Sequence, residues 1–178
     1  MLTYKALYIF HYSYTTCSQA DENFTASPWT ERLNVFNTDI RSFEPGKKYD
    51  LIISNPPFFE DDLRSGDQRK NQAKHDTGLS LAELVAMAEK NIAADGILAV
   101  LLPHHRVEYF IEEAVNKGFH LNEKILIKQS STHNYFRGIL FLGRKKTGVN
   151  ESVISIKDDN NRYTAEFIAL LKDYYLYL

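Results

Sequence analysis

The chain has 178 residues, of which 44% are hydrophobic, with 21 basic and 23 acidic side chains. Such a length and apolar content are typical of one globular domain, and they exclude a disordered, collagen-like or low-complexity chain. The formal net charge of −2 excludes a uniformly basic, histone-like surface. A local cluster of basic side chains could still bind nucleic acid.

Membrane insertion, secretion and metal binding have no support in the sequence. No apolar run reaches the roughly 18 residues that a membrane-spanning helix needs, and the N-terminus lacks the cleavage pattern of a signal peptide. We therefore expect a soluble, cytoplasmic protein. The single cysteine, Cys17, excludes an internal disulfide and a multi-cysteine zinc site, and the six histidines are scattered along the chain. No metal is expected.

The first part of the chain predicts a helix, two strands and a loop. Residues 18–32 are expected to form a helix that ends near Ser27-Pro28, because the residue before a proline avoids the α region. Residues 33–36 predict a strand, and a β-branched run over 50–54 predicts a second strand that is buried on both faces. Residues 59–78 carry many charges and almost no apolar periodicity, which is typical of a long loop.

After this loop, helices and strands alternate, which favours an α/β layered domain. Apolar residues at helical spacing over 81–92 predict a helix that stops near Asp95-Gly96. The polar stretch SSTHNYFR separates two of the later strands. The remaining expected helices cover 106–117 and 164–174, and the remaining strands cover 97–102, 124–128, 138–142 and 153–156.

The most informative segment is Asn55-Pro56-Pro57-Phe58, which directly follows a predicted buried strand. Open α/β sheets place their ligand crevice at such strand ends. The prolines have no amide hydrogen, so the backbone is stiff and nearby carbonyls are free to accept hydrogen bonds. The asparagine amide adds another acceptor, and the phenylalanine ring can lie on a planar substrate. This combination suits an exocyclic amine on a flipped nucleobase that receives a methyl group.

The same four residues have a simpler interpretation. Asparagine and proline are common turn residues, so the segment could merely terminate the strand. Four residues by themselves leave both interpretations open.

Longer stretches of sequence bear on this choice. They are SNPPFF with the following EDDL, QAKHDTGLSL, ILAVLLP, and the ending SVISIKDDNNRYTAEFIALLKDYYLYL. In these stretches the chain resembles the bacterial tRNA (adenine-N6)-methyltransferases that modify valine tRNA beside the anticodon, from about residue 19 to residue 178. The resemblance implies a class I, Rossmann-like methyltransferase fold, with S-adenosylmethionine as cofactor and tRNA as partner.

The resemblance also implies roles for single residues. Asn55 and the Pro56 carbonyl would hold the target amine, Pro57 would shape the turn and Phe58 would stack on the adenine. Asp39 occupies the position of an acidic residue that contacts the adenine of the cofactor in related enzymes, with a solvated or helix-capping aspartate as the alternative. The Asn-Pro-Pro-aromatic signature is shared with other amino-group methyltransferases, so guanine N2 methylation of ribosomal RNA stays open as an alternative.

Two groups of basic side chains are candidates for holding tRNA phosphates, with solvated loop charges as the alternative. The first group lies in the loop after the motif and consists of Arg64, Arg69, Lys70, Lys74 and His75. The second group, Arg144, Lys145 and Lys146, follows the strand predicted over 138–142.

The N-terminal part departs from the family. A cofactor-binding turn of the G-x-G-x-G kind is not visible, since no two of the eight glycines are separated by one residue. We therefore expect an N-terminally truncated methyltransferase that lacks its first two strands, with residues 1–16 as an unrelated leader and 17–178 as the methyltransferase-like domain. Alternation over 4–10 permits a replacement strand. On this view cofactor binding is weakened, and an inactive remnant that binds RNA or protein is a further alternative.

Overall fold

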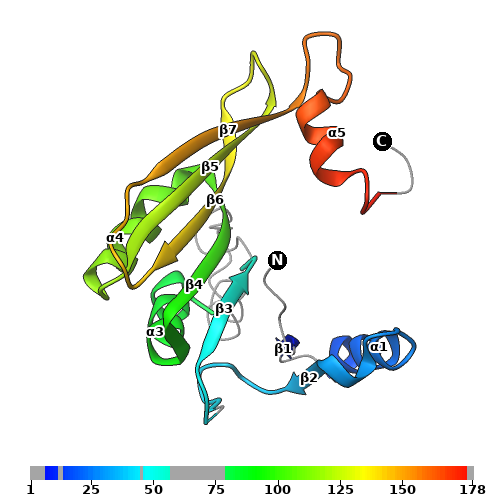
Figure 1. Cartoon of the computed structure of the whole chain (residues 1–178), viewed down its shortest axis with the longest axis vertical. Coiled ribbons are helices and arrows are strands. Elements are labelled where there is room, and N and C mark those ends of the chain that lie inside the picture. Colours follow the sequence, from blue (N-terminus) through cyan, green and yellow to red (C-terminus); the bar gives the residue numbers. More distant parts are fainter. Residues whose placement is uncertain (1–6, 12–13, 45, 57–78, 176–178) are drawn as a thin grey trace, which may run out of the picture. The chain divides into compact units, whose positions relative to one another are not determined.

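The computed structural model describes residues 7–11, 14–44, 46–56 and 79–175. These residues form two compact units, one up to Gly46 and one from Lys47 onward. Each unit has its own sheet, of two strands in the first and five in the second (Figure 1). The predicted leader over 1–16 and domain over 17–178 stay predictions.

The first unit is a β-α-β arrangement. Its two strands run parallel, with Leu7 opposite Leu33 and His11 opposite Asn37. Parallel neighbours need a crossover connection, which the helix supplies. The buried thiol of Cys17 on that helix donates to the Phe36 carbonyl at 3.8 Å, so the helix packs on the second strand. The elements are β1 (Leu7–His11), α1 (Tyr14–Thr25), the short 3₁₀ turn η1 (Thr30–Arg32) and β2 (Leu33–Asn37).

These elements confirm part of the sequence prediction and correct another part. The strand predicted over 33–36 is present as β2, and the strand that alternation permits over 4–10 is present as β1. The helix predicted over 18–32 instead begins at Tyr14 and ends at Thr25. The backbone N–H of Trp29 bonds the Ser27 hydroxyl at 3.0 Å, which closes a turn around Pro28 where the helix cannot continue.

The second unit is a mixed five-stranded sheet with the strand order β3-β4-β6-β5-β7. Strands β3 and β4 are parallel, as are β5 and β7, and β6 runs antiparallel to both β4 and β5. The edge where β3, β4, β5 and β7 end and β6 begins is the carboxyl edge (Figure 1). The strands are β3 (Tyr49–Ser54), β4 (Ile92–Pro103), β5 (His120–Ser130), β6 (Tyr135–Gly143) and β7 (Asn150–Lys157). The helical elements are α3 (Leu81–Asn91), η2 (His104–Arg106), α4 (Val107–Asn116) and α5 (Ala165–Leu171).

The junction between α3 and β4 differs from the prediction. The helix was expected to reach Gly96, whereas it ends at Asn91 and the strand begins at Ile92. Tyr49 of β3 pairs with Ile92, and Leu51 pairs with Ile97. Four residues of β4 therefore lie opposite one residue of β3, and the register of the two strands shifts at this point. A Cβ atom at Gly96 would lie 2.7 Å from the Tyr49 carbonyl oxygen, so a residue without a side chain is required at this close approach.

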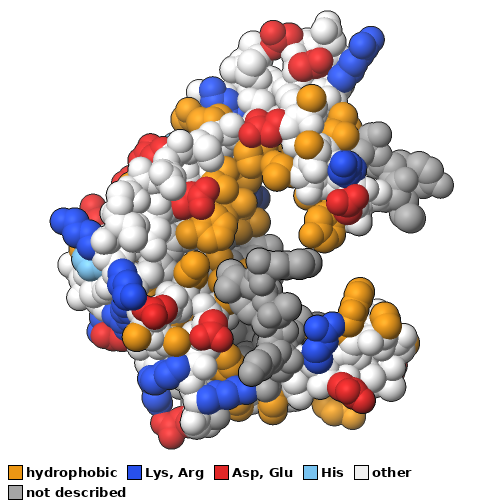
Figure 2. All heavy atoms as spheres, viewed as in Figure 1, with side chains coloured by type: hydrophobic (Ala, Val, Ile, Leu, Met, Phe, Trp, Pro, Cys, Tyr) orange, Lys and Arg blue, Asp and Glu red, His pale blue; other side chains and the backbone are white. Residues whose placement is uncertain are grey.

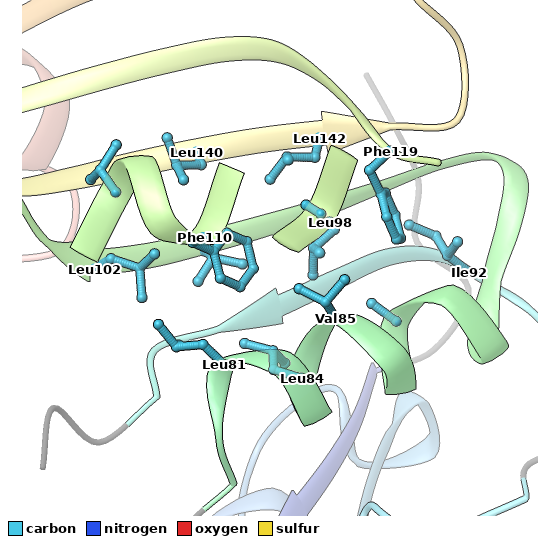
Figure 3. Close-up of a cluster of buried hydrophobic side chains, with 14 residues drawn as sticks. Leu81, Leu84, Val85, Ile92, Leu98, Leu102, Phe110, Phe119, Leu140 and Leu142 are labelled. Atoms are coloured by element: carbon cyan, nitrogen blue, oxygen red, sulfur yellow. The ribbon is translucent and has the colours of Figure 1, made fainter. Parts of the chain in front are cut away.

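The hydrophobic core lies between the five-stranded sheet and the helices α3 and α4. Apolar side chains of α3 and α4 meet alternate residues of β4 and β6, such as Leu98, Leu102 and Leu140 (Figure 3). Phe110 of α4 and Phe119, just before β5, are completely buried. Burial of side chains of this size contributes roughly 1.5–3 kcal/mol each. Packing against this core holds β3 and β4 in place, and with them the carboxyl edge of the sheet.

The other face of the sheet keeps apolar side chains partly in contact with solvent. Ile52 packs against the core, and the next residue, Ile53, is 71% exposed. Successive side chains of a strand point to opposite faces, so only one face of β3 is covered. The prediction that this strand is buried on both faces is therefore wrong, because β3 stands at the end of the strand order in the described sheet. Figure 2 shows hydrophobic side chains gathered over the middle strands of the five-stranded sheet.

Candidate functional site at the carboxyl edge of the sheet

The first half of the Asn-Pro-Pro-Phe motif lies at the carboxyl edge. Ser54, the last residue of β3, pairs with Val100 of β4, so Asn55 and Pro56 follow at the level where β4 approaches its own end. Pro56 is buried and Asn55 is exposed. The proline therefore anchors the turn while the asparagine amide remains accessible to a ligand. An exposed carboxamide oxygen can accept hydrogen bonds from an exocyclic amine.

Several predicted site residues lie outside the described residues, and their placement stays a prediction. Pro57 and Phe58, which complete the motif, are two of them. The five basic candidates Arg64, Arg69, Lys70, Lys74 and His75 belong to the same segment.

Asp39 lies in the first unit, two residues after β2 ends. The Nε of Arg41 donates to both Asp39 carboxylate oxygens, at 2.9 and 2.8 Å, and the Arg41 backbone N–H donates to Oδ1 at 2.9 Å. These hydrogen bonds lower the pKa of the Asp39 carboxyl below its ordinary value of 3.8, so it is ionised at neutral pH. The Arg41 Nη2 also donates to Oδ2 at 2.5 Å, so these four hydrogen bonds occupy about all of the acceptor positions of the carboxylate. A carboxylate is the kind of acceptor that the adenine amino group of S-adenosylmethionine requires, and such a contact would take the place of one of the Arg41 hydrogen bonds.

The second basic group lies at the other edge of the sheet, and its contact with phosphate stays a prediction. Gly143, the last residue of β6, lies opposite His120, the first residue of β5, so Arg144–Lys146 follow at the edge opposite Asn55. The Arg144 guanidinium donates to the Lys117 carbonyl at 2.6 Å and to the Glu89 carbonyl at 3.1 Å, and it lies 4.1 Å from the Phe119 ring centroid. Lys145 pairs with Asp95 at 2.6 Å. Arg144 therefore holds α3 and α4 to the sheet.

A pocket that the sequence did not suggest opens at the carboxyl edge. It has a volume of about 410 Å³ and is lined by His104, Lys128, His133, Asn134 and Tyr135. His104 follows β4, Lys128 stands near the end of β5, and Tyr135 begins β6. In the sequence, His104 is one of several scattered histidines, and His133 and Asn134 belong to the polar connection between two strands. The signal in the sequence that could have indicated this pocket is the density of polar and aromatic residues in SSTHNYFR.

The described ranges 7–11, 14–44, 46–56 and 79–175 contain neither a metal-binding cluster nor a membrane-spanning helix. Within them, no group of three or more histidine, cysteine or acidic side chains could hold a metal ion. No helix in those ranges has the length and apolar character needed to cross a membrane.

Comparison with known proteins identifies the family, although no family model matches the chain. A tRNA1(Val) (adenine(37)-N6)-methyltransferase of Pseudoalteromonas translucida (strain TAC 125) is 34% identical over 158 residues, which cover 89% of this chain and 68% of that protein. The enzyme of the same name from Flavobacterium psychrophilum is 31% identical over 160 residues, covering 89% and 68%. The chain thus spans about two thirds of the length of these curated relatives.

The fold comparison agrees with the sequence comparison. The crystal structure of a predicted O-methyltransferase from Agrobacterium tumefaciens matches with a TM-score of 0.67 at 13% identity, covering 93% of this chain and 76% of that one. The fold is therefore that of the S-adenosylmethionine-dependent methyltransferases, as predicted. With sequence identity above 30% over two thirds of a curated relative, the chain belongs to the family of tRNA1(Val) (adenine(37)-N6)-methyltransferases.

Proposed function

We propose that this protein transfers a methyl group from S-adenosylmethionine to N6 of an adenine in tRNA, at position 37 of a valine tRNA as its relatives' names indicate. The observation that carries this proposal is the exposed Asn55 amide beside the buried Pro56, at the carboxyl edge of a methyltransferase sheet. Family membership supports the choice of adenine over guanine. Such an enzyme works where tRNA is found, which supports the cytoplasm as its compartment.

The chain's own residues position the acceptor. Asn55 accepts a hydrogen bond from the adenine amine through Oδ1, and the Pro56 carbonyl accepts a second one. Holding both hydrogens turns the nitrogen lone pair out of conjugation with the ring and directs it at the methyl carbon. With S-adenosylmethionine bound, the amine nitrogen would bond to the methyl carbon as the carbon–sulfur bond breaks, and the amine would release a proton to solvent. In this proposal Pro57 shapes the turn, and the Phe58 ring stacks on the adenine.

The cofactor would be held in part by Asp39. Its carboxylate is ionised and held by Arg41, and in place of one of these hydrogen bonds it would accept one from the adenine amino group of S-adenosylmethionine. When bound, S-adenosylmethionine supplies an electrophilic methyl group on a sulfonium.

Asn55→Ala in the full chain tests the proposed function directly. The variant removes the acceptor that aligns the amine, and loss of one such positioned group lowers kcat by roughly 10²- to 10³-fold. The assay uses S-adenosylmethionine carrying a labelled methyl group, unmodified tRNA and ribosomal RNA, followed by nucleoside analysis. We expect N6-methyladenosine in tRNA.

The matched control is Asn160→Ala, because Asn160 is an exposed asparagine in the turn after β7. Its rate should equal that of the unchanged chain. Label found as N2-methylguanosine in ribosomal RNA would instead establish the alternative acceptor. Full activity of Asn55→Ala would remove the assigned role of the motif.

A further inference from the structure

The pocket at the carboxyl edge has the composition of a nucleotide-binding surface. The five described residues that line it include a lysine, two histidines, a tyrosine and an asparagine, and none of them is acidic. Lysine supplies a positive charge for a phosphate, and aromatic rings supply surfaces on which bases stack. This combination is typical of single-stranded nucleic acid binding rather than of a site for a small apolar ligand.

The side chains of the pocket are arranged around Tyr135. The Lys128 Nζ lies 4.9 Å from the centroid of the Tyr135 ring. The His104 ring lies 5.3 Å from the same ring, at an interplanar angle of 43°. A phosphate next to Lys128 would therefore be close to two rings against which a base can rest.

His133 is held in place by its neighbours in the β5–β6 connection. The Ser130 hydroxyl lies 2.7 Å from Nδ1 of His133 and 3.1 Å from the Thr132 hydroxyl. The His133 N–H also donates to the Ser130 carbonyl at 3.2 Å. These contacts order the tip of the connection, so His133 and Asn134 present their side chains on a defined backbone.

The position of the pocket relative to Asn55 decides which nucleotide it could take. Asn55 stands one residue beyond the Ser54–Val100 pair, and the next pair along β4 is Leu101 with Ile139. Tyr135 begins β6 four residues further on and two strands across, roughly 16 Å from Asn55 by strand rise and spacing. This span to Tyr135 is longer than one base, which favours a neighbouring nucleotide over the target adenine as the occupant of the pocket.

We infer that His104, Lys128, His133, Asn134 and Tyr135 form a second RNA site that binds a nucleotide flanking the target, with Lys128 on its phosphate and the rings on its base. This inference rests on the proposed function, because it assumes that RNA occupies the same edge of the sheet. It is independent of the basic loop predicted to hold phosphates, since the pocket uses other residues.

The test is Lys128→Gln in the full chain, with an RNA hairpin of the valine tRNA anticodon arm as probe. Removing one phosphate contact should weaken binding about three- to tenfold, and should reduce the slope of log Kd against log salt by about 0.7. The KM for the hairpin should rise while kcat at saturating RNA stays unchanged. Lys128→Arg should restore most of the affinity, because it keeps the charge.

Lys117→Gln is the matched control, since Lys117 is a half-exposed lysine at the opposite edge of the sheet, and it should bind like the unchanged chain. If the unchanged chain methylates the hairpin and Lys128→Gln has the same Kd and salt slope, the pocket is not an RNA site. The proposed function then remains intact. An unchanged chain that neither binds nor methylates the hairpin overturns the proposed function, and the pocket with it.

Discussion

The lowered pKa of the Asp39 carboxyl has one main cause, its neighbour Arg41. Arg41 supplies both the side-chain and the backbone hydrogen bonds that lower the pKa of this group. Both side chains are about four-tenths exposed, so solvent screens the pair and its contribution to stability is small. At the residue scale the pair fixes the orientation of the carboxylate, because Arg41 holds both of its oxygens.

Replacing Arg41 by glutamine tests this origin. In Arg41→Gln, the pKa of Asp39 should rise toward its ordinary value of 3.8, which an NMR titration of the carboxyl carbons would measure. The folded-state pKa is lowered, so the stabilisation by the pair is present above pH 3.8 and is lost as the pH falls through the folded pKa. The difference in unfolding free energy between the two chains should thus vanish at the acid end. An Asp39 pKa equal in both chains would contradict this account.

At the scale of elements, the start of α3 depends on a reciprocal cap. The Ser80 hydroxyl accepts from the Glu83 N–H at 3.2 Å, and the Glu83 carboxylate accepts from the Ser80 N–H at 2.8 Å. Such a capping box satisfies two donors that the first helical turn leaves unpaired. Because α3 contributes Leu81, Leu84 and Val85 to the core, its first turn is coupled to global unfolding.

Ser80→Ala should therefore lower the free energy of unfolding by about 1 kcal/mol, measured by urea denaturation. Thr164→Ala is the matched comparison, because Thr164 caps α5 through the Phe167 N–H at 3.1 Å. The Thr164 hydroxyl also donates to the Ser155 carbonyl of β7 at 2.7 Å. Helix α5 has no buried residue, so loss of both bonds should loosen α5 from β7 and shift the midpoint of the main transition less than Ser80→Ala does. Equal shifts of the midpoint in both variants would contradict the assignment of α3 to the core.

Sequence patterns located the elements better than they located the junctions. The strand over 50–54 was predictable in position, because an apolar run bounded by polar residues has few other solutions. Its burial on both faces was predicted wrongly, because the run does not reveal that β3 lies at the end of the strand order. The end of α3 was not predictable, because Ile92 continues the apolar helical spacing and is drawn into β4 by pairing with Tyr49. Asn55 could be found from the motif, whereas His104 and Lys128 are brought together only by the order of the strands.

At the scale of the whole molecule, Arg144 joins three parts of the second unit. Its guanidinium contacts the last turn of α3 through the Glu89 carbonyl, the end of α4 through the Lys117 carbonyl, and the Phe119 ring. Cations are favourable at helix C-termini, where carbonyls lack partners within the helix. One side chain thus holds both helices against the sheet.

Arg144→Gln should lower the free energy of unfolding by about 1–3 kcal/mol, because charged hydrogen bonds are lost and carbonyls are left without this donor. The same variant should bind the RNA hairpin with unchanged affinity and salt dependence, since this edge faces away from Asn55. Thermal denaturation and a binding titration measure the two effects. Weaker RNA binding at unchanged stability would return Arg144 to the role of a phosphate contact.

The pairing of β5 on both sides has a consequence for how RNA would arrive. Lys128 lies opposite Tyr135 on one side and opposite Ser155 of β7 on the other. The backbone that carries this lysine is therefore ordered before any ligand is present, and association loses little main-chain conformational entropy there. A binding site whose backbone is ordered in advance favours rapid binding of the flanking nucleotide. The slower unstacking of the target adenine would then take place while the RNA is already bound.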